Sequence, residues 1–177
     1  MNFDNFEGGR LATEHLVQLG HRRIAFIGGA PGHPDSDERH RGYMAALDAG
    51  GVTYDPNLIV PGMYHEGSGL EAVEQLLEKK RRFTAIFAAN DQMAFGAALG
   101  LHRRSLKVPD DVSLVGFDGL ISSAFSLPPL TTVTYPSQEM GRLAASAMLQ
   151  LLRGGKVVAV VPTPQIVVRE STRKLRG

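Results

Sequence analysis

Short apolar runs alternate with longer segments of helical periodicity along this chain. The runs are typical of buried strands, and they centre on Ile24, Ile59, Ile86, Leu114 and Ile166. Between them, apolar residues recur every three or four positions, as on one face of a helix. These segments predict helices over residues 6–19, 36–48, 67–79, 91–103 and 137–153. Alternating strands and helices joined by short loops predict an α/β fold, with a parallel sheet flanked by helices.

Composition narrows the class of protein. The 177 residues suggest one domain, or one and a part. The chain is 43% hydrophobic, enough for an ordinary core, and its net charge of +1 gives no global reason to bind nucleic acid or a membrane. It lacks cysteine, which excludes disulfides and thiolate metal sites. No apolar run could span a membrane, and residues 1–5 lack the features of a secretory signal, so we expect a cytoplasmic protein.

Polar side chains follow three of the predicted strands at the point where each strand ends. They are Asn90 with Asp91, Asp118, and Ser36 in the loop after a glycine pair. The carboxyl ends of parallel strands meet at one edge of a sheet, where small ligands bind in open α/β folds. The alternative is that Asn90 or Asp91 only caps the helix that follows, since both residue types are preferred caps.

A series of motifs connects the chain with a known family. In order, they are Asp4-Asn5-Phe6-Glu7-Gly8-Gly9-Arg10, Gly20-His21-Arg22-Arg23-Ile24-Ala25-Phe26-Ile27-Gly28, Glu38-Arg39-His40-Arg41-Gly42-Tyr43, Phe87-Ala88-Ala89-Asn90-Asp91-Gln92-Met93-Ala94, Val108-Pro109-Asp110-Asp111-Val112-Ser113, Gly116-Phe117-Asp118, Pro129-Leu130-Thr131-Thr132-Val133 and Arg169-Glu170-Ser171-Thr172. Through these motifs, the chain resembles the sensor part of the lactose-repressor (LacI/GalR) family of bacterial transcription regulators. One such motif is weak evidence, but all of them in the family's order are strong evidence.

The resemblance implies a periplasmic-binding-protein-like core of two lobes, of which only the second is complete. Residues 1–20 and 131–160 would hold helices of a truncated first lobe, 21–130 the second lobe, and 161–177 its final strand and a basic, solvated tail. The apolar stripes of the first-lobe helices would then lack their usual partner. They would fold back on each other or pack against a second copy of the chain.

The family's function implies the partners of this chain. We expect a part that senses a small effector, a sugar or sugar derivative in the family's manner, and that forms homodimers. Apolar residues in the loop 120–127 are typical of a partner face. In this family DNA is bound through a helix-turn-helix head. We find no such head in this sequence, because the predicted helix 6–19 is followed by a strand and not by a recognition helix, so we expect no sequence-specific DNA binding by this chain alone. No membrane partner is expected.

Five residues are candidates for the effector site. Arg39 stands three residues before Gly42, as the family's effector-contacting arginine does, and a guanidinium can bind hydroxyls or a carboxylate through two hydrogen bonds. Asp118 matches the family's acid after Gly-Phe. Asn90 can both donate and accept hydrogen bonds, which suits a polyol.

Tyr64 and Ser36 complete the set. An aromatic often stands at the position of Tyr64 in the family, and its ring suits the apolar face of a sugar or a purine. Ser36, with Asp35, is a weaker candidate. For each residue the alternative is structural: an exposed helix arginine, a loop or helix cap for Asp118 and Asn90, and ordinary partial burial for Tyr64. If half of the cleft is absent, we expect weak binding or none.

Other functional classes fit the sequence less well. Asp91 and Asp118 could serve an enzyme as acid and base, but the sequence has no nucleophile elbow, phosphate loop, dinucleotide motif or metal-spaced histidine pair. We therefore expect no catalysis, no cofactor and no metal. Two alternatives remain, a sugar-binding protein of the same fold and a dimerisation module without a ligand. The family's second acid after Asp118 is replaced here by Gly119, which weakens any inference about the sugar.

Overall fold

A single twisted sheet forms the centre of the molecule. The structure, a computed structural model, describes residues 3–156 and 162–175. Within them, the strand order is β2-β1-β3-β4-β5-β6. The strands are β1 (Ile24–Ile27), β2 (Ile59–Val60), β3 (Ala85–Ala88), β4 (Ser113–Asp118), β5 (Thr131–Thr134) and β6 (Gln165–Val167). The helices are α1 (Asn5–Gln18), α2 (Pro34–Ala49), α3 (Glu66–Glu78), α4 (Asp91–Arg103) and α5 (Ser137–Leu152), with short 3-10 turns η1 (Pro56–Leu58) and η2 (Ile121–Ala124).

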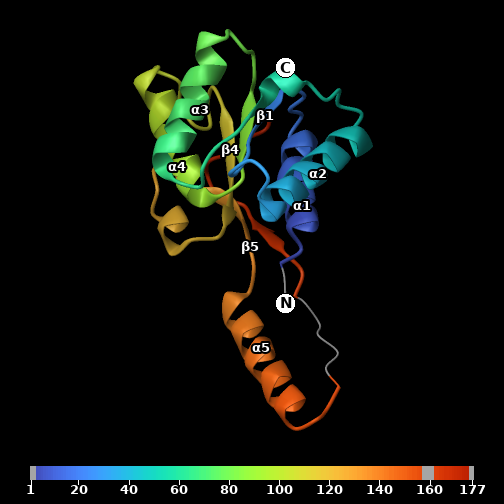
Figure 1. Ribbon diagram of the computed structural model, residues 1–177. Helices are drawn as coiled ribbons and strands as arrows, with labels where there is room; N and C mark the ends of the chain where they lie inside the picture. The colour runs from blue at the N-terminus through green and yellow to red at the C-terminus, as the bar shows by residue number, and fades with distance from the viewer. Residues whose placement is uncertain (1–2, 157–161, 176–177) are drawn as a thin grey trace.

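The sheet confirms the predicted fold class, with one strand reversed. Strands β1 to β5 pair in parallel, with Ala25 opposite Ile86 and Phe117 opposite Val133. The expectation of a parallel strand at Ile166 is wrong, because β6 runs antiparallel to β5. The reason is that α5 leads the chain away from the carboxyl end of β5 (Figure 1), so the chain re-enters the sheet from that same end.

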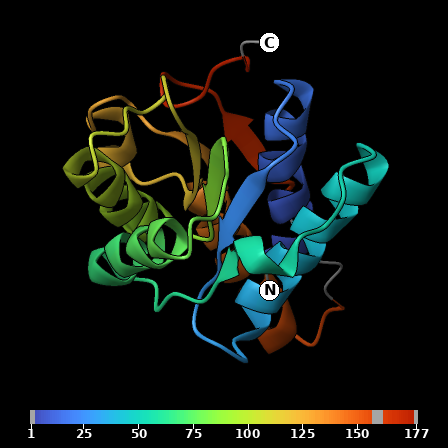
Figure 2. The same ribbon diagram turned by 90° about the horizontal axis from the view of Figure 1, so that it is seen from above.

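Two helix pairs cover the sheet, one pair on each face. Helices α1 and α2 lie on one face and α3 and α4 on the other, with the sheet between them (Figures 1 and 2). Within each pair, glycine lets the backbones touch. A Cβ atom at Gly42 of α2 would overlap the carbonyl oxygen of Phe6, and one at Gly96 of α4 would overlap that of Glu66. The positions of these glycines therefore set how closely the helices can pack.

The packing of α1 corrects one expectation. Ala12 and Leu16 of this helix are fully buried in the same core as the sheet. The prediction that the apolar stripe of residues 6–19 lacks a partner is therefore wrong, since α2 and the sheet cover it. Helix α1 thus packs on the same sheet as α2, whereas the resemblance alone assigns residues 1–20 to a truncated first lobe.

Helix α5 behaves as the sequence predicted. It projects from the sheet (Figure 1), and of its residues, all of which the structure describes, Met140 alone is buried. Its large exposed apolar side chains are Met148, Leu149, Leu151 and Leu152. The apolar sides of α1 and α5 do not pack against each other, so α5 remains without a partner in the described part of this chain. No helix in the described residues is long and apolar enough to cross a membrane.

The segment after β6 ties the amino ends of the strands together. Buried His21 lies within hydrogen-bond distance of Thr84 Oγ1 (2.9 Å), Ser113 Oγ (3.1 Å) and the carbonyl oxygen of Arg173 (3.1 Å). Arg173 in turn pairs with Asp110 at 2.9 Å. Arg169 donates to the carbonyl oxygen of Leu130 at 2.6 Å. The expectation of a solvated basic tail is thus wrong for Arg169 and Arg173; Arg176 lies outside the described residues.

The close contact of α3 and α4 generates a prediction about stability. Alanine favours a helix over glycine by about 1 kcal/mol, but at position 96 its Cβ would push into the backbone of Glu66. Overpacking of this kind typically costs about 1–3 kcal/mol. We expect Gly96→Ala to lower the free energy of unfolding, measured by urea denaturation. Gly141→Ala in α5 is the matched control, because nothing lies near its Cβ position, and it should be neutral or stabilising. A Gly96→Ala variant as stable as the unmodified chain would contradict this packing.

Candidate functional site

The order of the strands predicts a ligand-binding position at the carboxyl edge of the sheet. From β1 the chain passes through α2 to β2 on one side, and then through α3 to β3 on the other side of β1. Connections that leave neighbouring strands toward opposite faces open a crevice between them, where ligands bind in such folds. Gly28 and Gly29 follow β1 here, Asn90 follows β3, and Asp118 ends β4.

Arg39 lies across this edge and is almost fully buried. It is 7% exposed, and its Nε donates to Asn5 Oδ1 at 2.8 Å. Its Nη1 donates to the carbonyl oxygen of Ala89 and lies 3.7 Å from Asp118 Oδ1. The guanidinium carbon stands 3.7 Å from the centroid of the Phe117 ring. Burial lowers the pKa of Arg39 from its usual value, while Asp118 opposes this shift. Arg39 is therefore part of the framework as well as a candidate ligand contact.

Asp118 is the charged group of the edge that meets solvent. Its side chain is 37% exposed, and its backbone φ of 109° lies in a region that non-glycine residues rarely adopt. Burial raises the pKa of Asp118 to about 6; Arg39 opposes the shift, and Asp91 and Asp35 add to it. A strained backbone and a carboxylate that is poorly stabilised by its own protein are typical of a functional site.

Asn90 caps α4 and supports the neighbouring loop. Its Oδ1 accepts from the backbone N–H of Met93 at 2.9 Å, and its Nδ2 donates to the carbonyl oxygen of Tyr64 at 3.0 Å. These contacts show that Asn90 caps α4, as the structural interpretation of this residue predicted. One N–H of the side-chain amide is left for a ligand.

Tyr64 carries an unsatisfied polar atom. Its hydroxyl is buried and makes no hydrogen bond of normal geometry in the described part of the chain. Burial raises the pKa of Tyr64, and the nearby Arg39 and the Ser36 hydroxyl oppose this shift. Its backbone φ is 63°, and its ring packs so closely on Gly29 that any Cβ there would overlap it. Ser36 fixes the same glycine, since its Oγ accepts from the N–H of Gly29 at 2.8 Å. A buried hydroxyl without a partner costs stability, so Tyr64 is a candidate for a hydrogen bond to a ligand.

The structure thus brings all five candidates to one edge of the sheet. Arg39 contacts Asp118 and the carbonyl of Ala89, the residue before Asn90. Asn90 holds the Tyr64 loop, and Tyr64 and Ser36 meet at Gly29. No group of three or more metal-ligating side chains gathers in residues 3–156 and 162–175. The edge instead offers a carboxylate, hydrogen-bond donors and an aromatic ring.

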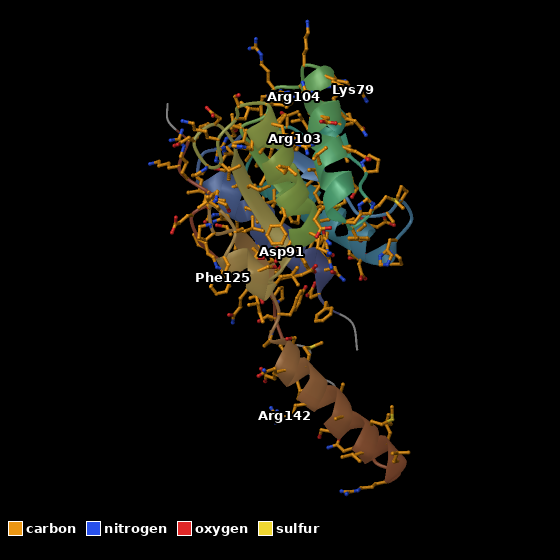
Figure 3. The ribbon with its side chains drawn as sticks, turned by 90° about the vertical axis from the view of Figure 1, so that its left-hand side faces the viewer. Lys79, Asp91, Arg103, Arg104, Phe125 and Arg142 are labelled. Carbon is orange, nitrogen blue, oxygen red and sulfur yellow. The ribbon has the colours of Figure 1, made fainter. Side chains whose placement is uncertain are left out.

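Sequence reasoning missed two supporting residues. Asn5 and Phe117 hold Arg39 in place, and both stand inside the quoted motifs, which was the available signal. Asp91, considered as a catalytic acid, is fully buried. It accepts from the N–H of Leu120 (2.8 Å), Ser123 Oγ (2.6 Å) and Thr132 Oγ1 (2.5 Å). Its role is therefore to hold the η2 loop against α4 (Figure 3).

Comparison with known proteins agrees with this architecture. The family described as "Periplasmic binding protein-like domain" matches residues 13–172. The transcriptional repressor PurR of Haemophilus influenzae is 32% identical over 97% of this chain and 52% of its own length. The chain thus spans about half the length of the curated relatives it matches.

Solved structures give the same result. The transcriptional regulator CelR in complex with cellobiose has a TM-score of 0.89 and 37% identity, covering 96% of this chain and 52% of that one. A dimeric Lac repressor with a C-terminal deletion has a TM-score of 0.91 and 31% identity, covering 98% of this chain and 64% of that one. With its fold, its motifs and a family match over residues 13–172, this chain belongs to the periplasmic-binding-protein-like domains, and over nearly its whole length it is similar to transcriptional regulators of the LacI type.

Proposed function

We propose that this chain senses a small hydroxylated effector, a sugar or sugar derivative, at the carboxyl edge of its sheet. The observation that carries the proposal is the half-exposed carboxylate of Asp118, held 3.7 Å from buried Arg39. A carboxylate can accept hydrogen bonds from two sugar hydroxyls, and its attraction to an arginine fixes its orientation. The same edge carries the buried hydroxyl of Tyr64, which has no partner among the described residues.

The other candidates would complete such a site. Asn90 offers one remaining amide N–H, and the ring of Tyr64 offers an apolar face for a sugar ring. Ser36 acts through Gly29, which it holds by a hydrogen bond of 2.8 Å. The relative CelR is described in complex with cellobiose, which makes this disaccharide a sensible first probe. Binding would then favour closure of two lobes, and closure would reposition a DNA-binding head in a complete, cytoplasmic regulator.

The chain also carries a surface suited to a second copy of itself. Ile121, Phe125 and Leu127 are 84%, 82% and 96% exposed. Beside them, a cavity of about 640 Å³ is lined largely by apolar residues, among them Phe95, Leu99, Leu106 and Leu127. Large exposed apolar surfaces mark interaction sites. We therefore propose that the regulator forms homodimers through this face, as the Lac repressor described above is dimeric.

Removing the Tyr64 hydroxyl tests the effector site. In the complete regulator, Tyr64→Phe should weaken binding of its sugar by about 10-fold, because one hydrogen bond to the ligand is lost. The thermal midpoint of the free protein should stay equal or rise, since this hydroxyl has no partner in the described residues. Isothermal titration calorimetry with cellobiose, monosaccharides and purine bases gives the affinities. Tyr54→Phe, an exposed tyrosine elsewhere, is the control. Unchanged affinity in Tyr64→Phe would remove this residue from the site.

The pKa of Asp118 leads to a prediction about pH. Its pKa in the folded state, about 6, lies above the ordinary value of 3.8. The folded state therefore binds the proton more tightly, and this stabilisation is present at low pH and is lost as the pH rises through about 6. Asp118→Asn should thus have the higher thermal midpoint at pH 7 to 8, and its advantage should shrink toward pH 4. Because the side chain is 37% exposed, screening keeps the gain small.

The same variant should lose its response to the effector. Exposed Asp48 in α2 gives the matched control, Asp48→Asn, which should show neither effect. A midpoint difference between Asp118→Asn and the unmodified protein that does not change with pH would refute the assigned shift. A normal effector response would refute the role of this carboxylate in binding.

The homodimer is tested by placing a charge on its proposed face. Phe125→Asp should convert a dimer at tens of micromolar into a monomer, because burying an unpaired carboxylate in an apolar interface is costly. Analytical ultracentrifugation measures the mass. Met63→Asp, also an exposed apolar residue but on another loop, should leave the dimer intact. A monomeric mass for the unmodified protein would overturn the proposal.

A further inference from the structure

The turn after α3 gathers positive charge at the edge of the sheet opposite the effector site. Helix α3 begins after β2 and ends before β3, so its last residues lie toward the amino ends of the strands. The sequence there is Lys79-Lys80-Arg81-Arg82. Arg103 and Arg104 end the adjacent helix α4 at the same side (Figure 3). An accumulation of one sign of charge attracts small ions of the other sign.

Backbone geometry folds Arg81 back beside the end of the helix. Lys80 has a φ of 51°, a left-handed conformation that commonly ends helices. The N–H of Arg81 then donates to the carbonyl oxygen of Leu76 at 2.9 Å, and that of Lys80 donates to Leu77 at 2.9 Å. These bonds satisfy carbonyl groups at the helix end, which reduces the negative potential they would otherwise present to an anion.

A small cavity lies between this turn and the edge strand β2. It has a volume of about 160 Å³, and its polar lining residues are Asn57, Gln75, Lys79 and Arg81. Each of these four side chains carries hydrogen-bond donors. A sugar-sized pocket usually exceeds about 300 Å³, whereas this cavity suits a small ion with a few waters, each occupying about 30 Å³.

Arg81, which lines this cavity, has one side-chain donor without a partner in the described residues. The Nε of Arg81 is buried and has no hydrogen-bond partner within residues 3–156 and 162–175. Lys79 and Arg81 take part in none of the ion pairs that these residues form. The neighbouring acid, Asp55, is already engaged by Arg23 (3.3 Å) and by the backbone N–H of Asn57 (3.0 Å). An unpartnered guanidinium donor is costly, so the Arg81 side chain would gain by turning this donor toward an acceptor from outside the chain.

We propose that this cavity is a second ligand site, which binds a compact oxyanion, the phosphate or carboxylate group of a small molecule, between Arg81 and Lys79. A planar guanidinium binds such groups through paired hydrogen bonds, and the ammonium adds charge. The amides of Gln75 and Asn57 would donate to its remaining oxygens. The site is separate from the effector edge and does not depend on the effector's identity.

The test is a titration of the 177-residue chain with inorganic phosphate, followed by ¹H–¹⁵N NMR at constant ionic strength set with chloride. We expect saturable shifts at the Arg81 Nε–H and at Asn57 and Gln75, with half-saturation in the millimolar range. A parallel titration with succinate distinguishes carboxylate from phosphate, and saturation by either anion supports the site.

Two double variants distinguish specific binding of the anion in the cavity from nonspecific attraction by nearby positive charge. Lys79→Gln with Arg81→Gln should weaken binding by at least about 10-fold, because charge-assisted hydrogen bonds are lost. Arg103→Gln with Arg104→Gln removes the same charge outside the cavity and should change binding by less than about 2-fold. The proposal is overturned if neither anion gives saturable shifts at tens of millimolar, if both double variants lose affinity equally, or if the shifts occur only around Arg39 and Asp118.

Discussion

The burial of Arg39 is the constraint on which the effector edge depends. A guanidinium that is 7% exposed is costly unless hydrogen bonds and an opposite charge compensate for its burial. Here Asn5 and the carbonyl of Ala89 accept hydrogen bonds from Arg39, Asp118 provides the opposite charge at 3.7 Å, and the ring of Phe117 lies against the guanidinium. The contacts join α1, α2, β3 and β4 at one point. Removing this side chain would therefore cost stability as well as the proposed ligand contact, which is why Asp118 and Tyr64 are the better probes of binding.

Asp91 connects that edge with the apolar face proposed for dimerisation. It follows Asn90 directly, and its carboxylate holds Leu120 and Ser123 of the adjoining loop. Burial raises its pKa, while the hydrogen bonds from Ser123 and Thr132 counteract this. The position of Phe125 and Leu127 on the surface thus depends on a buried acid one residue away from the effector edge. A shift of α4 on effector binding would reach the dimer face through this contact.

The edge carries features that do not stabilise the free chain. Asp118 has a raised pKa and a positive φ, and the hydroxyl of Tyr64 is unsatisfied in the described structure. Local rules are typically broken where a protein binds something, because the ligand supplies the missing partner. The exposed apolar side of α5 is a similar case on a larger scale, since Met148 and Leu152 have no cover from the described residues. The rest of the expected first lobe, or a second copy of the chain, would bury this side.

The sequence by itself determined the local elements and the membership of the family. Periodicity located every helix to within a few residues, and strand-end positions singled out Asn90 and Asp118, because a parallel sheet brings such ends together. Tertiary structure decided what each polar group contacts. It made Asn90 a cap, Asp91 a buried acceptor and Arg173 an anchor, and it placed α1 against α2. It also reversed β6 and left Arg81 Nε without an acceptor in the described residues. Pattern specifies which face of an element is apolar, whereas the partner of a buried donor or acceptor depends on contacts between residues far apart in the chain.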